Sequence, residues 1–153
     1  MSYEEIMSKM PFDEPFRFVD EIIFADADNI VGTYLFRKDL FFYKGHFRDH
    51  PVTPGVILTE VMAQIGLVAF GLYLLGLEEN ARFFAGKELF PVLTSTQMDF
   101  YKMVLPGQKV TVRSKKIMFR HGKLKCKVNM EDESLNIVSE GILTGMITKL
   151  NHK

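Results

Sequence analysis

The sequence predicts an α+β domain in which one long buried helix lies in the concavity of an antiparallel sheet of five to seven strands. Three observations indicate this fold. Residues 56–75 are almost wholly apolar, the segments before and after them have the composition of strands, and a chain of 153 residues fits one domain. We therefore treat residues 1–153 as a single domain.

The residues before the apolar stretch predict a short helix and a hairpin. Residues 3–9 form the candidate helix. The stretch FRFVDEIIFA (16–25) predicts a strand, ADADN predicts a turn, and IVGTYLFRK (30–38) predicts the antiparallel neighbour, since β-branched and aromatic residues dominate both. The following residues, 39–55, contain two prolines and two glycines and predict a loop.

The long helix is predicted over residues 54–75. Thr53 is a candidate N-cap, and Pro54 suits the first helical position because its missing N–H would have no acceptor there. A helix that is apolar all round is buried either in a protein core or in a membrane. Glu60 and Gln64 in the first turns, together with strands that need a core, favour the core helix over a membrane span.

The residues after the helix predict further antiparallel strands. Lysines and arginines partly alternate with apolar residues there, which is typical of a sheet with one wet and one packed face. LPGQ and RHGK are predicted turns between strands. The predicted strands cover residues 92–104, 109–119, 124–132 and 133–150.

The formal net charge is zero, so no overall positive field would attract nucleic acid or an anionic membrane. The charges are nevertheless unevenly distributed along the chain. Residues 1–30 hold eight acids against two basic residues, whereas residues 109–130 hold eight basic residues and no acid. The basic region is either a solvated sheet face or a docking surface for an acidic partner.

Cysteine usage and the N-terminus indicate a cytoplasmic protein. Cys126 is the only cysteine, which excludes an internal disulfide and a cysteine-cluster zinc site and suits a reducing compartment. The N-terminal MSYEEIMSKM lacks the pattern of a signal peptide.

Four residues near the helix start could carry chemistry. Burial would raise the pKa of Glu60, and a protonated carboxyl is a general acid, with Gln64 at i+4 able to hydrogen-bond it. His46 could act as a base, and an N–H at Gly55 could stabilise an oxyanion. Together they suit elimination of a β-hydroxyl as water, next to a thioester carbonyl. Taken singly, such a histidine is more often structural, and a hydrogen-bonded structural acid explains Glu60 equally well.

The stretch FFYKGHFRDHPVTPGVILTEVMAQ (41–64) resembles the signature of bacterial FabZ-type β-hydroxyacyl-(acyl-carrier-protein) dehydratases. PFRFVDEI (15–22) and MDFYKMVLPGQKV (98–110) are similar to two further segments of that family. The resemblance implies a hotdog fold and conversion of a (3R)-3-hydroxyacyl thioester to the trans-2-enoyl thioester. It implies a homodimer, or a trimer of such dimers, that acts on substrates carried by acyl carrier protein, with no metal or redox cofactor.

The resemblance also implies roles for individual residues. His46 would be the general base of one subunit, and Glu60 of the partner subunit would be the general acid. The Gly55 N–H would bind the thioester oxygen, with Val56 beside it and Gln64 in the same pocket. A glutamate at position 60 favours the FabZ type over the sister dehydratase that also isomerises the double bond, which has an aspartate there.

The chain departs from the family pattern at several positions. Arg48 replaces a proline, Phe12 replaces a histidine, and the segment around residues 76–92 is longer than expected. Phe83, Phe84 and Phe90 in that segment are candidates for lining the acyl tunnel, although core packing explains them at least as well. A hotdog thioesterase and a non-catalytic carrier-binding subunit remain alternative functions, and the preferred acyl chain length stays open.

Overall fold

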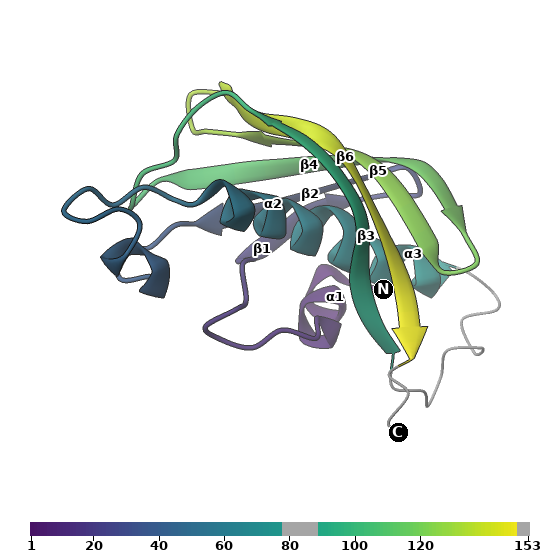
Figure 1. Cartoon of the computed structure of the whole chain (residues 1–153). Coiled ribbons are helices and arrows are strands. Elements are labelled where there is room, and N and C mark those ends of the chain that lie inside the picture. Colours follow the sequence, from purple (N-terminus) through teal and green to yellow (C-terminus); the bar gives the residue numbers. More distant parts are fainter. Residues whose placement is uncertain (78–88, 150–153) are drawn as a thin grey trace.

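The computed structural model describes residues 1–77 and 89–149 (Figure 1). Helix α1 (Tyr3–Lys9) begins at a capping box in which the Ser2 hydroxyl accepts from the Glu5 N–H and the Glu5 carboxylate accepts from the Ser2 N–H. This confirms the predicted helix 3–9. The short 3₁₀ helix η1 (Phe41–Lys44) lies in the segment that was predicted to be a loop.

The long helix runs without interruption from residue 55 to residue 77. It consists of α2 (Gly55–Ala63), the π-helical segment η2 (Gln64–Ala69) and α3 (Phe70–Leu77). The predicted start was one residue early. Pro54 is extended, with ψ of 137°, and occupies the N-cap position, so Thr53 is not the cap. The Thr53 hydroxyl instead hydrogen-bonds Tyr43, at 2.6 Å.

Within the described residues, six antiparallel strands form one sheet in the order β1-β2-β4-β5-β6-β3, within the predicted five to seven. His121 and Gly122 form the turn between β4 and β5 with positive φ values of 51° and 75°, as a two-residue hairpin requires. The strands are β1 (Glu21–Ala25), β2 (Asn29–Leu35), β3 (Leu89–Phe100), β4 (Lys109–Arg120), β5 (Lys123–Glu131) and β6 (Ile137–Lys149).

The first strand is shorter than predicted, because residues 16–20 lie outside the sheet. The Phe18 N–H donates to the Gln64 side chain on the helix instead of to a neighbouring strand, at 2.8 Å. The predicted turn that follows is confirmed. The Asp26 carboxylate accepts from the N–H groups of Asp28 and Asn29, which is the hydrogen-bond pattern of an Asx turn.

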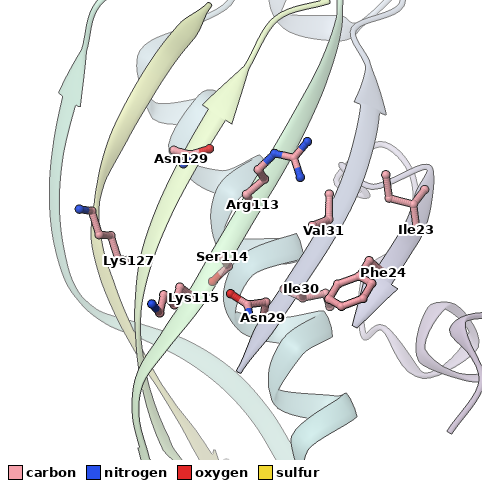
Figure 2. Close-up of a pocket in the computed structure, with 10 residues that line it drawn as sticks. All are labelled: Ile23, Phe24, Asn29, Ile30, Val31, Arg113, Ser114, Lys115, Lys127 and Asn129. Atoms are coloured by element: carbon pink, nitrogen blue, oxygen red, sulfur yellow. The ribbon is translucent and has the colours of Figure 1, made fainter. Parts of the chain in front are cut away.

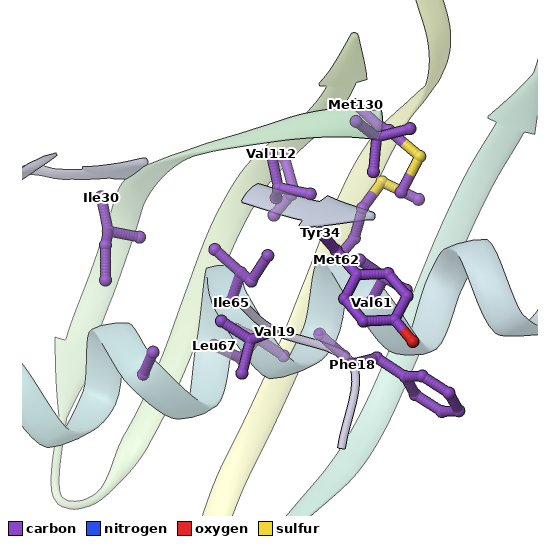
Figure 3. Close-up of a cluster of buried hydrophobic side chains, with 14 of the residues drawn as sticks. Phe18, Val19, Ile30, Tyr34, Val61, Met62, Ile65, Leu67, Val112 and Met130 are labelled. Atoms are coloured by element: carbon purple, nitrogen blue, oxygen red, sulfur yellow. The ribbon is translucent and has the colours of Figure 1, made fainter. Parts of the chain in front are cut away.

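The sheet curves around the long helix and buries it (Figure 1). Its inner face packs on the helix through Val112, Val128 and Met130, and Figure 3 shows Ile65 and Met62 of the helix within this cluster. The helix is long and apolar enough to cross a membrane, but 61% of its most apolar stretch is buried inside the protein. Its hydropathy is therefore explained by core packing.

Candidate functional site

Glu60 lies on the second turn of the long helix and is half-buried among apolar side chains. Desolvation raises the pKa of this carboxyl above its ordinary value of 4.5, and a hydrogen bond from Gln64 lowers it by a smaller amount. The direction of this shift confirms the prediction made from its apolar surroundings. A carboxyl with a raised pKa retains its proton to higher pH and can donate it as a general acid.

Gln64 is fully buried and holds Glu60 in place. Its Oε1 accepts from the Phe18 N–H at 2.8 Å, and its Nε2 donates to the Phe16 carbonyl and to Glu60 Oε1, each at 2.9 Å. The backbone N–H can only donate and the carbonyl can only accept, which fixes the orientation of the amide. Glu60 Oε1 must therefore accept, and the proton of the neutral acid is left to Oε2.

An apolar pocket of about 210 Å³ extends from Glu60 along the long helix. The helix forms one wall, the ends of β3 and β6 and the β4–β5 hairpin form the opposite wall, and Lys9, Pro11 and Phe12 contribute from the N-terminal segment. The remaining lining residues are Ala63, Leu67, Val68, Gly71, Leu72, Leu75, Pro91, Val92, Leu93, Phe119, Gly122, Leu124, Gly145, Met146 and Ile147.

Several of these lining residues were not predicted from the sequence. Lys9, Pro11, Phe12 and Phe119 reach the pocket because of the tertiary fold, and no local pattern identifies them as pocket residues. Phe83 and Phe84, which were predicted to line an acyl tunnel, lie outside the described residues. Phe90, the third candidate, is half-buried on β3 and is not among the residues that line this pocket.

His46 follows η1 in a loop whose hydrogen bonds fix the imidazole. Its Nδ1 lies 2.7 Å from the Val52 carbonyl, and the Val52 N–H donates to the His46 carbonyl at 2.8 Å. Because a carbonyl only accepts, Nδ1 carries the proton in the neutral ring and Nε2 has a free lone pair. The ring stacks on Phe47 at 4.0 Å between centroids. Nε2 is therefore the ring nitrogen that can accept a proton.

The loop that carries His46 is attached to the rest of the domain just before the long helix. The Thr53 N–H donates to the Val104 carbonyl at 2.9 Å, and the Thr53 hydroxyl bonds Tyr43. Gly55 and Val56 then form the first helical positions, where N–H groups lack intrahelical acceptors. Val56 is 77% exposed, so this positive helix end lies at the surface of the single chain.

A side chain at Gly55 would meet its own subunit without a clash. A Cβ there would lie 3.5 Å from the Phe100 ring, which is ordinary van der Waals contact. The absence of a side chain is therefore not required by packing within one subunit, and the close approach of a substrate oxygen to this N–H stays a prediction.

Glu60 and His46 do not line a common pocket among the described residues of the single chain. Among the described residues, those that line the pocket beside Glu60 do not include His46. Strand β3 lies at one end of the sheet, pairs on one side with β6, and has no partner strand on its other side among the described residues. Exposed apolar side chains lie on this strand, after it and at the helix start, among them Val56, Leu93, Phe100, Tyr101 and Met103. An open edge flanked by apolar surface is typical of a protein–protein interface.

The basic side chains of β4 and β5 lie on the outer face of the sheet. Val112 and Val128 point inward, whereas Arg113, Lys115 and Lys127 alternate with them and are exposed. Figure 2 shows the outer face around a groove of about 530 Å³, which Phe24 also lines.

Part of this basic charge is neutralised within the chain. Arg113 pairs with Glu131 at 3.3 Å, and Lys116 pairs with Asp28 at 3.5 Å. Lys115 lies directly opposite Lys127 across the two strands, an arrangement of like charges that destabilises a sheet.

A metal site is not evident in the part of the chain that the structure describes. Within residues 1–77 and 89–149, no group of three or more His, Cys, Asp and Glu side chains could hold a metal ion. Cys126 is fully buried, and burial raises the pKa of its thiol to about 11.

Solved structures of similar shape confirm the hotdog fold. The dehydratase heterocomplex ApeI:P from Xenorhabdus doucetiae aligns with a TM-score of 0.74 at 13% identity, over 95% of this chain and 91% of that one. A mutant of the thioesterase PA1618 from Pseudomonas aeruginosa aligns with a TM-score of 0.67 at 10% identity, over 98% and 96%. At such low identity these likenesses concern the fold alone.

Sequence comparison gives a narrower result. A family model described as a FabA-like domain matches residues 10–137. The 3-hydroxyacyl-[acyl-carrier-protein] dehydratase FabZ of Psychrobacter arcticus is 32% identical, over 87% of this chain and 89% of the relative. The FabZ of Syntrophobacter fumaroxidans is 30% identical, over 96% and 94%. The chain therefore belongs to the FabA-like family, as a member of the FabZ type.

Proposed function

We propose that this protein is a (3R)-3-hydroxyacyl-[acyl-carrier-protein] dehydratase that forms the trans-2-enoyl thioester in acyl-chain biosynthesis. The observation that carries the proposal is a carboxyl with a raised pKa, Glu60, positioned by Gln64 at one end of an apolar pocket. Such a pocket accepts an acyl chain, and such an acid protonates a departing hydroxyl. The FabZ relatives support the same assignment.

The reaction uses side chains and backbone of the protein only. His46 Nε2 removes a proton from C2 of the substrate, and the electron pair forms the C2–C3 double bond. The C3 hydroxyl takes the proton of Glu60 Oε2 and leaves as water, so the imidazole ends protonated and the carboxyl ends ionised. A backbone N–H at Gly55 stabilises the negative charge that develops on the thioester oxygen. Proton transfer from His46 to Glu60 through solvent restores both groups.

A homodimer is the smallest active unit in this proposal, with His46 of one subunit facing Glu60 of the other. Three features support it: the open edge of β3, the exposed apolar side chains beside it, and a pocket that Glu60 lines and His46 does not. We propose a trimer of dimers as the larger assembly. Its presence is tested by the mass of the purified protein in solution.

The activity is tested with a 3-hydroxyacyl thioester by following enoyl absorbance and free thiol in the same sample. Dehydration raises the absorbance and releases no thiol, whereas a thioesterase releases thiol. His46→Ala and Glu60→Gln are expected to lower kcat by at least about 100-fold, the usual contribution of an acid or base. Release of thiol without enoyl product would reject the proposal.

The carrier protein is proposed to dock on the basic outer face of β4 and β5. Carrier proteins are acidic, and Lys115 and Lys127 are opposed like charges that an acidic partner would relieve. Reversing Arg113 or Lys116 would also break ion pairs within the chain, which makes Lys115→Glu with Lys127→Glu the cleaner test.

This double reversal is expected to raise KM for carrier-bound substrate about tenfold at low salt, and to leave KM for the same acyl group on a short synthetic thiol unchanged. If the double reversal leaves KM for the carrier-bound substrate unchanged, the carrier protein does not dock on this face. The proposal needs no metal or redox cofactor and places the enzyme in the cytoplasm.

A further inference from the structure

Three glycines of the described residues line the pocket beside Glu60, and the structure explains two of them. Gly122 has a φ of +75°, a conformation that side chains rarely adopt. A Cβ at Gly145 would lie 3.3 Å from both Leu67 Cδ1 and the Val92 carbonyl oxygen, which is tighter than ordinary contact. Turn geometry and close packing therefore account for these two positions.

Gly71 is different, because neither its backbone nor its packing against residues 1–77 and 89–149 requires glycine. It lies within the helical segment α3, and a Cβ there would meet Leu124 Cδ2 at 3.8 Å, an ordinary contact. Alanine would thus fit and would favour the helix over glycine. The same helix shows the contrast at Gly66, where a Cβ would lie 3.1 Å from both methyl groups of Val128.

Gly71 also has a particular position along the pocket. It lies eleven residues, or about three helical turns and 16 Å, beyond Glu60, on the helix face that includes Leu67 and Leu75. A cavity of about 150 Å³ holds benzene, which has six carbon atoms. By the same proportion, the pocket of about 210 Å³ has room for about eight carbon atoms. A side chain at position 71 would occupy the part of this volume remote from the acid.

We propose that Gly71 determines the length of the acyl chain that the enzyme accepts, by leaving open the far half of the pocket that begins at Glu60. This inference rests on the proposed dehydratase function and adds its substrate class: 3-hydroxyacyl groups with an unbranched aliphatic tail of medium length. The space left at Gly71 takes the terminal methylenes of that tail.

The test is the kcat/KM profile over a series of 3-hydroxyacyl carriers with four to fourteen carbons, for wild type, Gly71→Ala, Gly71→Leu and Gly71→Phe. A buried methylene contributes about 0.8 kcal/mol, so each methylene excluded from the pocket lowers kcat/KM about fourfold. Longer substrates are expected to lose activity progressively from Ala to Leu to Phe. The shortest substrate is expected to stay within about twofold of wild type.

Gly76→Ala is the matched control for Gly71→Ala, because Gly76 is exposed on the same helix, does not line the pocket, and would place its Cβ 3.0 Å from the flexible end of the Met1 side chain. It is expected to leave the profile unchanged. Gly71→Ala is expected to raise Tm by about 3 °C. If the larger side chains prevent folding, Gly71→Ala still decides the test, because its single added methyl group is expected to lower kcat/KM on the longest accepted chain about fourfold.

An unchanged profile in the folded Gly71 variants, or an equal loss at every chain length, would overturn the inference. Either outcome leaves the dehydratase function standing, because wild-type turnover is measured in the same series. Failure of wild type to dehydrate any of these substrates would instead reject the proposed function.

Discussion

Removing the Gln64 amide is expected to destabilise the fold. It also leaves the Glu60 carboxyl without the hydrogen bond that positions it. Gln64→Ala leaves the Phe18 N–H, in a fully buried residue, without an acceptor, at a cost of about 1–3 kcal/mol. The lost hydrogen bonds to Phe16 and Glu60 add about 0.5–1.5 kcal/mol each. The total is about 2–6 kcal/mol, and for a chain of this length it lowers Tm by about 10 °C.

Thermal unfolding followed by circular dichroism measures this effect, with two matched variants. Gln64→Met keeps the volume and removes the hydrogen bonds, so it should lose nearly as much stability as Gln64→Ala. Gln108→Ala removes an amide that makes one hydrogen bond, to the Leu105 N–H in a turn, and should cost about 1 kcal/mol. A Gln64→Met variant as stable as wild type would refute the claim that this amide joins the N-terminal segment to the helix.

Two further predictions concern single side chains. Glu60→Gln removes a carboxyl whose pKa in the folded protein is raised above 4.5. In wild type, the stability that this carboxyl contributes is fully present below pH 4.5 and is lost as the pH rises through the folded pKa. The variant is expected to lose activity and yet to gain Tm over wild type as pH rises from 4.5 to 8; equal pH profiles of Tm for the two proteins would contradict this. Tyr34→Phe is expected to raise stability by about 1 kcal/mol in denaturant unfolding, because the buried Tyr34 hydroxyl has no hydrogen-bond partner among the described residues. A Tyr34→Phe variant less stable than wild type would show that the hydroxyl does make a hydrogen bond, which would contradict this reasoning.

The fold was predictable from the sequence because its strongest signals are local. The apolar run of the long helix, the Asx turn at Asp26 and the His121–Gly122 hairpin turn are each determined by a few neighbouring residues. The strand order was not predictable, since nothing local places β3 beside β6 at the edge of the sheet. The π-helical segment that starts at Gln64 likewise has no sequence pattern of its own.

The site was predictable in part. The hydrogen bond between Gln64 and Glu60 follows from their i+4 spacing and is confirmed. The bonds from Gln64 to Phe16 and Phe18 join residues more than forty positions apart, and they replaced a strand that the composition of residues 16–20 had suggested. Ion pairing of Arg113 and Lys116 was also hidden in the sequence, because their acid partners lie on other strands or turns.

Mixing two inactive variants tests most directly whether the site is shared between subunits. His46→Ala and Glu60→Gln homodimers are unfolded, combined in equal amounts and refolded. If each site takes its histidine from one subunit and its glutamate from the other, every mixed dimer has one intact site. Random pairing makes half of the dimers mixed, so dehydratase activity should return to about a quarter of the wild-type value. Activity that stays at the level of the separate variants would contradict a site shared by two chains.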